Sequence, residues 1–82
     1  MVSLTWDEHK RLANFTKHKL DFSALTLDFF LVAHFVHARA GRLKAIGWLA
    51  GSAIVVVFAP LGTEAVAIIS MRPASRMERL LL

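Results

Sequence analysis

The spacing of apolar and polar residues changes along this chain, and the change predicts where helix gives way to sheet. Residues 7–19 place their polar side chains at helical intervals. The positions expected to share one helix face are Asp7, Lys10, Asn14, Lys17 and His18. From residue 29 onward, apolar and β-branched residues form short runs joined by Gly-containing connections, which is typical of an antiparallel meander. The strands expected are residues 29–36, 43–48, 53–59 and 64–71.

The ends of the helices carry recognisable caps. Residues 5–8 (TWDE) fit a capping box in which Thr5 caps the first helix and Glu8 reaches back to the open amide, with Asp7 as the alternative cap. A short helical turn is expected at residues 21–25. Residues 75–78 (SRME) repeat the capping-box pattern and predict a terminal helix that ends in three leucines.

These elements predict an α+β fold in one domain, residues 1–82. An N-terminal helix region is followed by a four-stranded antiparallel sheet and a short C-terminal helix. Residues 45–61 contain no charged residue and are close to the minimum length of a membrane span, so a small single-span membrane protein is an alternative. Gly47, Gly51 and Pro60 interrupt this run at strand-length intervals, which favours strands.

Composition points to a protein that works with a partner. A chain of 82 residues buries only about 60% of its unfolded surface. The hydrophobic fraction of 56% and the mean hydropathy of +0.53 exclude disorder and leave apolar surface for an interface. A net charge of +4 favours polyanions, acidic proteins or anionic membranes, and the absence of cysteine excludes disulfides. Residues 1–8 lack the features of a signal peptide, so a cytoplasmic location is expected.

Three motifs together resemble the BrnT family of bacterial type II toxins. Residues 6–18 carry the pattern W-D-E-x-K-x-x-x-N-x-x-K-H, followed by Phe22, and resemble the family's opening. Residues 42–47 (R-x-x-A-I-G) resemble its central strand. Residues 68–72 (IISMR), followed by Ala74, Ser75, Arg76, Glu78 and Arg79, are similar to its closing signature.

The resemblance implies a RelE-like fold and a metal-independent endoribonuclease without a cofactor, which cleaves RNA and inhibits translation. It also implies a BrnA-like antitoxin that binds operator DNA, so that the toxin reaches DNA only through its partner. Four positions depart from the family pattern, and they leave the level of activity open. Lys19 replaces a glycine, Gly41 an acidic residue, Ala67 an arginine and Pro73 a second basic residue.

The chemistry implied for such a toxin is in-line attack of a ribose 2′-hydroxyl on the adjacent phosphate, which requires proton transfer and stabilisation of negative charge. Arg72 is the first candidate for charge stabilisation, because a guanidinium grips two phosphate oxygens and stays cationic. Lys44 is a further catalytic candidate and Arg42 a candidate for phosphate binding. They are two residues apart and would share a strand face. Lys17 and Arg76 are further candidates for phosphate binding.

Proton transfer is assigned to His18, whose ordinary pKa allows both acceptance and donation near neutrality. Glu8 or Glu64 could act as the base if its pKa were adjusted. Structural roles stay open for the same residues: Glu8 as a cap, His18 as a hydrogen-bond donor at a helix end, and Arg72 as an anchor for the terminal helix. No metal-ligand spacing is present.

The apolar surplus predicts pairing with a second copy or with the antitoxin, as a homodimer or a heterotetramer. Leu80, Leu81 and Leu82 are candidates for this interface, because three consecutive leucines cannot all point inward from one helix. The competing function is a binding module that docks an acidic partner without catalysis.

Overall fold

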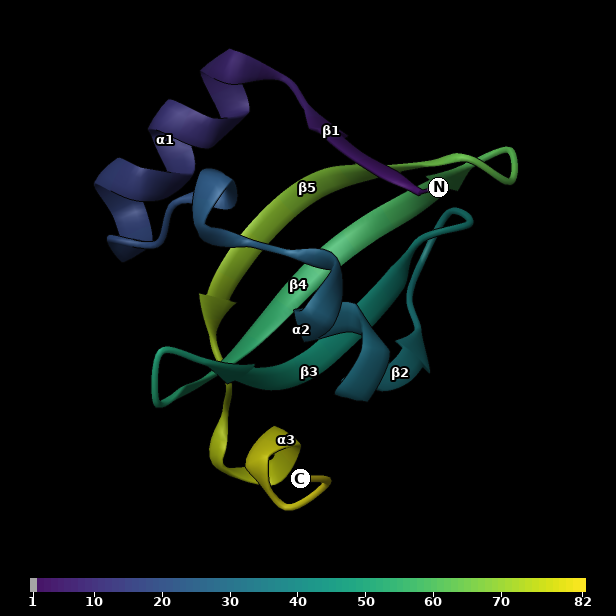
Figure 1. Ribbon diagram of the computed structural model, residues 1–82. Coiled ribbons are helices and arrows are strands. Elements are labelled where there is room, and N and C mark those ends of the chain that lie inside the picture. The colour runs from purple at the N-terminus through teal and green to yellow at the C-terminus, as the bar shows by residue number, and fades with distance from the viewer. Residues whose placement is uncertain (1) are drawn as a thin grey trace.

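The computed structural model describes residues 2–82 and contains a five-stranded mixed sheet with helices at its edge and on one face (Figure 1). The elements in chain order are β1 (Ser3–Trp6), α1 (Glu8–His18), η1 (Phe22–Ala24), α2 (Leu27–Val32), β2 (His34–His37), β3 (Leu43–Leu49), β4 (Ser52–Leu61), β5 (Ala65–Pro73) and α3 (Arg76–Arg79). The strand order is β1-β5-β4-β3-β2. Strands β2 to β5 are antiparallel neighbours, whereas β1 lies parallel to β5 at the sheet edge.

The α+β class is therefore confirmed, but the expected four-stranded antiparallel sheet and leading helix are wrong. Residues 3–6 form β1, with Leu4 and Trp6 turned toward the interior and Ser3 and Thr5 exposed. Thr5 thus lies within a strand and cannot cap α1. Asp7 is the cap, and its Oδ1 accepts hydrogen bonds from the amides of His9 and Lys10 at 2.8 and 3.3 Å.

The strand expected over residues 29–36 is also wrong, because the chain divides this segment between α2 and β2. Phe29 is buried from a helical turn, and its ring lies against Phe30 in an edge-on contact. A short apolar run does not distinguish a buried helix from a buried strand by periodicity. The three later strands, the helical turn near Phe22 and the capping box at Ser75 are confirmed.

The core lies between one face of the sheet, called here the inner face, and the elements η1 and α2, which cross it in Figure 1. Its fully buried side chains include Phe22, Val56 and Met71. Helix α2 approaches β3 very closely at Gly47, where an added Cβ would lie 2.9 Å from the Phe29 ring. The glycine of the central motif is therefore required by packing of α2 on the sheet.

Helix α1 packs beside β5 where β1 no longer accompanies it. Strand β1 pairs with β5 only as far as Ile68, so the β5 backbone beyond that point lacks a neighbouring strand on this side. Asn14, which is 8% exposed, fills the gap: its Oδ1 accepts the Met71 amide at 3.1 Å and its Nδ2 donates to the Leu20 carbonyl at 3.2 Å. One buried side chain thus fixes α1 against the sheet.

Residues 45–61, the segment of the single-span alternative, lie in β3, β4 and the turn between them. Across the described residues 2–82, no helix has the length and apolar character needed to cross a membrane.

Candidate functional site

A basic groove lies between α1 and the open side of β5, and we call it the helix groove. It has a volume of about 420 Å³ and is lined by Lys10, Ala13, Asn14, Lys17, His18, Ile69, Ser70 and Arg72. The structure therefore brings together three predicted site residues, Lys17, His18 and Arg72, from opposite ends of the chain. Lys10 joins them because it lies one helical repeat from Asn14, the residue that fixes α1 against β5.

Arg72 does not stand alone in this groove, because Glu78 of α3 grips its guanidinium with both carboxylate oxygens. The two contacts measure 2.7 Å from Nη1 to Oε1 and 2.8 Å from Nη2 to Oε2. Hydrogen bonding to Glu78 raises the pKa of Arg72, and hydrogen bonding from Arg72 lowers the pKa of Glu78 to about 2. The pair is therefore fully ionised at neutral pH, and Glu78 occupies the fork that would hold a phosphate.

Glu78 also completes the cap of α3. Its Oε1 accepts the Ser75 amide at 2.8 Å, while Ser75 Oγ accepts the Glu78 amide at 3.1 Å. The expected capping box and the alternative role of Arg72 as an anchor for the terminal helix are thus parts of one arrangement.

A second basic hollow lies where the β2–β3 turn meets the sheet, and we call it the turn cluster. It has a volume of about 460 Å³ and is lined by His37, Ala38, Arg39, Arg42, Lys44 and Val57. Arg42 and Lys44 share this hollow as their spacing predicted, but they do not line the helix groove with Arg72. His37 and Arg39 were not among the predicted site residues. They join because His37 pairs with Leu43 and the Arg42 amide donates to the Arg39 carbonyl across the turn.

The helix groove and the turn cluster open on the same face of the sheet, opposite the core, which we call the outer face. Lys44 is paired with Val57, and Val57 with Ser70, so these three side chains project from one face. Arg72 follows Ser70 by two residues and lies on that face as well. With strands about 4.8 Å apart, the Cα atoms of Lys44 and Ser70 are separated by about 10 Å. Only the Val57–Ser70 pair divides the two basic regions.

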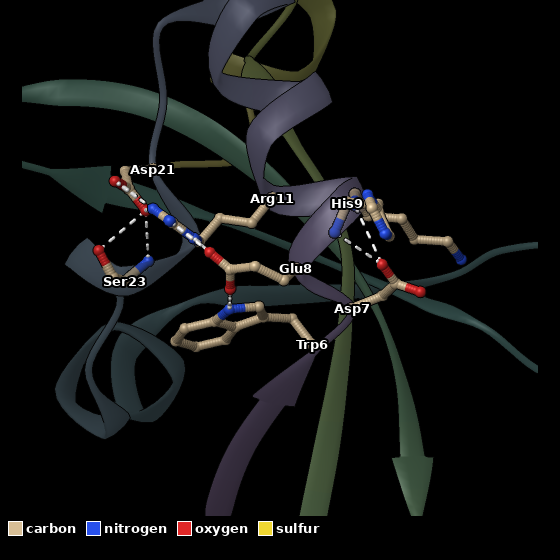
Figure 2. Close-up of polar contacts among 8 residues, drawn as sticks. Trp6, Asp7, Glu8, His9, Arg11, Asp21 and Ser23 are labelled. Carbon is tan, nitrogen blue, oxygen red and sulfur yellow. Dashed lines mark hydrogen bonds and ion pairs between the residues drawn. The ribbon is translucent and has the colours of Figure 1, made fainter.

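Glu8 lies in a different network, with Trp6, Arg11 and Asp21 (Figure 2). At 3.6 residues per turn it is about 160° around the helix from Lys10. Glu8 accepts hydrogen bonds from Trp6 Nε1 at 3.2 Å and Arg11 Nε at 2.6 Å. Arg11 also contacts Asp21 at 3.0 Å. The Arg11 hydrogen bond holds the pKa of Glu8 below its ordinary value, so the carboxylate is a weak base tied to structure. Glu8 therefore takes part in a structural network and does not line the helix groove.

The remaining candidates lie outside both hollows. Arg76 is exposed on α3, and Glu64 is exposed just before β5. Among the residues that the structure describes, no three His, Asp or Glu side chains gather as metal ligands would.

The departures from the family pattern have local structural settings. Lys19 ends α1 in the left-handed conformation with φ of 59°, where glycine carries no steric penalty. Gly41 has φ of 73° in the β2–β3 turn. Ala67 pairs with Ala59 in the sheet, and Pro73 is the last residue of β5.

Comparisons with known proteins identify a family and a solved structure that are similar to this chain. A family model described as "Ribonuclease toxin, BrnT, of type II toxin-antitoxin system" matches residues 6–78. Among solved structures, the chain is similar to the crystal structure of the Brucella abortus ribonuclease toxin BrnT. The two share 47% sequence identity and a TM-score of 0.87, over 93% of this chain and 100% of that one. No curated protein matches the chain.

Proposed function

This chain belongs to the BrnT family of ribonuclease toxins of type II toxin–antitoxin systems, and from that premise we propose that it cleaves RNA on the outer face of its sheet. The RNA backbone would run from the helix groove to the turn cluster. The observation that carries this proposal is the row Lys44–Val57–Ser70, which joins two basic hollows on one face.

The distribution of charge supports this path for RNA. Lys10, Lys17 and Arg72 line one end of the path, and Arg39, Arg42 and Lys44 line the other. A single-stranded backbone placed across them would meet cations on both sides of the neutral Val57–Ser70 pair. Contacts of this kind supply affinity without sequence preference and weaken as salt rises.

In the reaction proposed here, the ribose 2′-oxygen attacks phosphorus while the bond from phosphorus to the 5′-oxygen breaks. The 2′-hydroxyl proton leaves to a base, and a proton goes to the departing 5′-oxygen. His18, which lines the helix groove, is the residue we assign to proton transfer. Arg72 and Lys44 stabilise the extra negative charge on the phosphate oxygens, and Lys17 and Arg42 bind neighbouring phosphates.

For the partner, we propose a BrnA-like antitoxin that neutralises the toxin and carries the DNA-binding portion of the complex. The assembly expected is a heterotetramer in the cytoplasm, where the RNA substrate is found. Rescue of growth by the neighbouring open reading frame, when both are expressed together, tests this relationship.

The direct test of cleavage uses purified protein freed of antitoxin, a labelled single-stranded RNA and excess EDTA. We expect cleavage that leaves a 2′,3′-cyclic phosphate. Arg72→Ala and Lys44→Ala should each lower the rate by roughly 10²-fold or more, the loss typical of removing one group that stabilises a transition-state charge. Arg79→Ala removes an exposed cation that lines neither hollow and should change the rate less than twofold. Cleavage that persists unchanged in Arg72→Ala would remove its assignment to charge stabilisation.

A further inference from the structure

Strand β2 presents an open edge at the end of the sheet. Within residues 2–82 its one neighbouring strand is β3, and all four of its residues are exposed. The Ala38 amide donates to the Arg42 carbonyl at 2.9 Å, while the Arg42 amide donates to the Arg39 carbonyl of the turn at 3.1 Å. The Ala38–Arg42 position therefore carries one bond of the β2–β3 ladder and fixes its alternation. Hydrogen-bonded positions alternate along an antiparallel ladder, so Val36 faces β3 with its backbone groups, whereas Phe35 and His37 direct theirs outward. These outward groups are available to another strand.

The chain protects another unaccompanied backbone stretch but not this one. Beyond the end of β1, Asn14 takes up the Met71 amide of β5. Strand β2 (HFVH) is short, but it has no proline, lysine or bulge, which are among the devices that discourage pairing at a sheet edge. An unprotected edge of this kind is suited to strand addition by a partner.

An apolar hollow of about 320 Å³ extends across the inner face from Leu4 of β1 and Val66 of β5 to Phe35 at this edge. Phe35 and Phe58 belong to its sheet side, and Leu27 and Leu31 of α2 form its wall. Leu31 is 78% exposed and Phe35 is 49% exposed, although both are large apolar side chains. In a strand added to β2, every second side chain would point toward this hollow. These side chains would cover Leu31 and Phe35.

The charge around β2 identifies the chemistry of the partner. The strand leads directly into the turn cluster, where Arg39, Arg42 and Lys44 gather. Residues 29–63 contain no Asp or Glu, so β2 and its neighbours in a second copy of this chain would bring no carboxylate to these cations. An acidic partner complements the surface, whereas self-pairing through β2 does not.

We infer that the antitoxin neutralises this toxin by adding a strand to β2, with apolar side chains in the hollow beside Phe35 and carboxylates on the turn cluster. The inference rests on the proposed function, since it takes the partner to be the type II antitoxin. Carboxylates placed there would cover Arg42 and Lys44, and RNA could not then cross the outer face. Neutralisation would therefore follow from competition for the same cations.

Amide hydrogen exchange on the toxin, free and bound to the purified product of the neighbouring open reading frame, tests the strand addition. We expect exchange at Phe35 and His37 to slow at least tenfold in the complex. The Val36 amide, already directed toward β3, should change little and serves as the internal control. A complex that blocks cleavage while Phe35 and His37 exchange as fast as in free toxin would overturn the inference and leave the proposed function intact.

A matched pair of variants tests the hollow. Leu31→Asp places a charge in its wall and should weaken binding of the same antitoxin at least tenfold, measured by calorimetry. Leu12→Asp makes the same change on α1, at a leucine that is 52% exposed and lines none of the hollows described here. It should alter binding less than twofold. Both variants should cleave RNA normally without antitoxin, and loss of binding in both or neither would contradict the inference.

Self-association is the other outcome to be measured. If free toxin at high concentration forms a dimer by light scattering, with Phe35 and His37 already protected, then β2 is an interface between copies and the antitoxin inference fails. If no variant of the toxin, nor the unaltered protein, cleaves RNA under any tested condition, the proposed function fails first.

Discussion

The helix groove and the turn cluster are similar in size and charge, but they differ in whether the protein already pairs one of their cations with a carboxylate. In the helix groove, Asn14 fixes α1 to β5 and Glu78 neutralises Arg72. In the turn cluster, no ion pair within residues 2–82 involves Arg39, Arg42 or Lys44. An incoming phosphate or carboxylate can therefore bind the turn cluster at once, whereas at Arg72 it must share or displace Glu78.

This difference suggests that Arg72 acts in the chemical step and Arg42 in substrate binding, which steady-state kinetics can test. Arg72→Ala should lower kcat by roughly 10²- to 10³-fold, because it removes charge stabilisation that matters most in the transition state. Arg42→Ala should instead raise KM by about tenfold and leave kcat nearly unchanged, because it removes binding shared by ground and transition states. Steady-state cleavage of a short RNA measures both constants. Equal losses of kcat in the two variants would show that Arg42, like Lys44, acts on the reacting phosphate and not only in binding.

The attachment of α1 to β5, which forms the helix groove, depends on Asn14. Replacing it with leucine leaves the buried Met71 amide without an acceptor and the Leu20 carbonyl without its donor. We expect the free energy of unfolding in urea to fall by about 2 kcal/mol. Thr16→Ala removes an exposed hydrogen bond to the Leu12 carbonyl on the same helix and should cost less than about 0.5 kcal/mol. Equal stability of the two variants would mean that α1 is not fixed to β5 through this side chain.

Removing the charge that neutralises Arg72 should have a smaller effect, and it should strengthen RNA binding. Glu78→Gln removes the charge that faces Arg72 but keeps a side chain able to complete the capping box. We expect the affinity for single-stranded RNA to rise about threefold to tenfold, measured by fluorescence anisotropy at fixed salt. Glu64→Gln makes the same change of net charge at an exposed position outside both hollows. An equal rise in both variants would assign the effect to net charge alone.

The sequence predicted the part of the fold that carries clear periodicity. The β-branched run around Val55 and its glycine-bounded neighbours correctly indicated three antiparallel strands. Strand β1 was missed because it has four residues and a parallel partner about 60 positions away in the chain. Helix α2 was missed because Phe29 and Phe30 belong to an apolar run too short to show a helical period.

The candidate site was predictable to a similar extent. Motifs at the two ends of the chain supplied His18 and Arg72 as candidates, and the structure has both lining one groove. Spacing alone could not show that Lys44 would line a separate hollow, because that depends on the register that pairs Val57 with Ser70. Nor did it reveal the Glu78 carboxylate on Arg72, since the chain must turn after Pro73 before the two side chains can meet.

At acid pH, protonation of Glu78 should leave Arg72 without an ionised partner, as the cations of the turn cluster are at neutral pH. The pKa of Glu78 is lowered from 4.5 to about 2 in the folded protein, so the stability that its pairing contributes is present above pH 4.5 and is lost as pH falls toward 2. An ion pair this accessible is worth at most about 1 kcal/mol. Glu8 and Asp21 also have lowered pKa values, so their protonation destabilises the protein at acid pH as well. The pH dependence of the unaltered protein alone would therefore combine several groups. The difference in unfolding free energy between unaltered protein and Glu78→Gln isolates the pair. It should be constant above about pH 5, shrink as pH falls and vanish only below about pH 2. A difference independent of pH would show that the Gln side chain perturbs the α3 cap and that Arg72 gains nothing from the Glu78 charge.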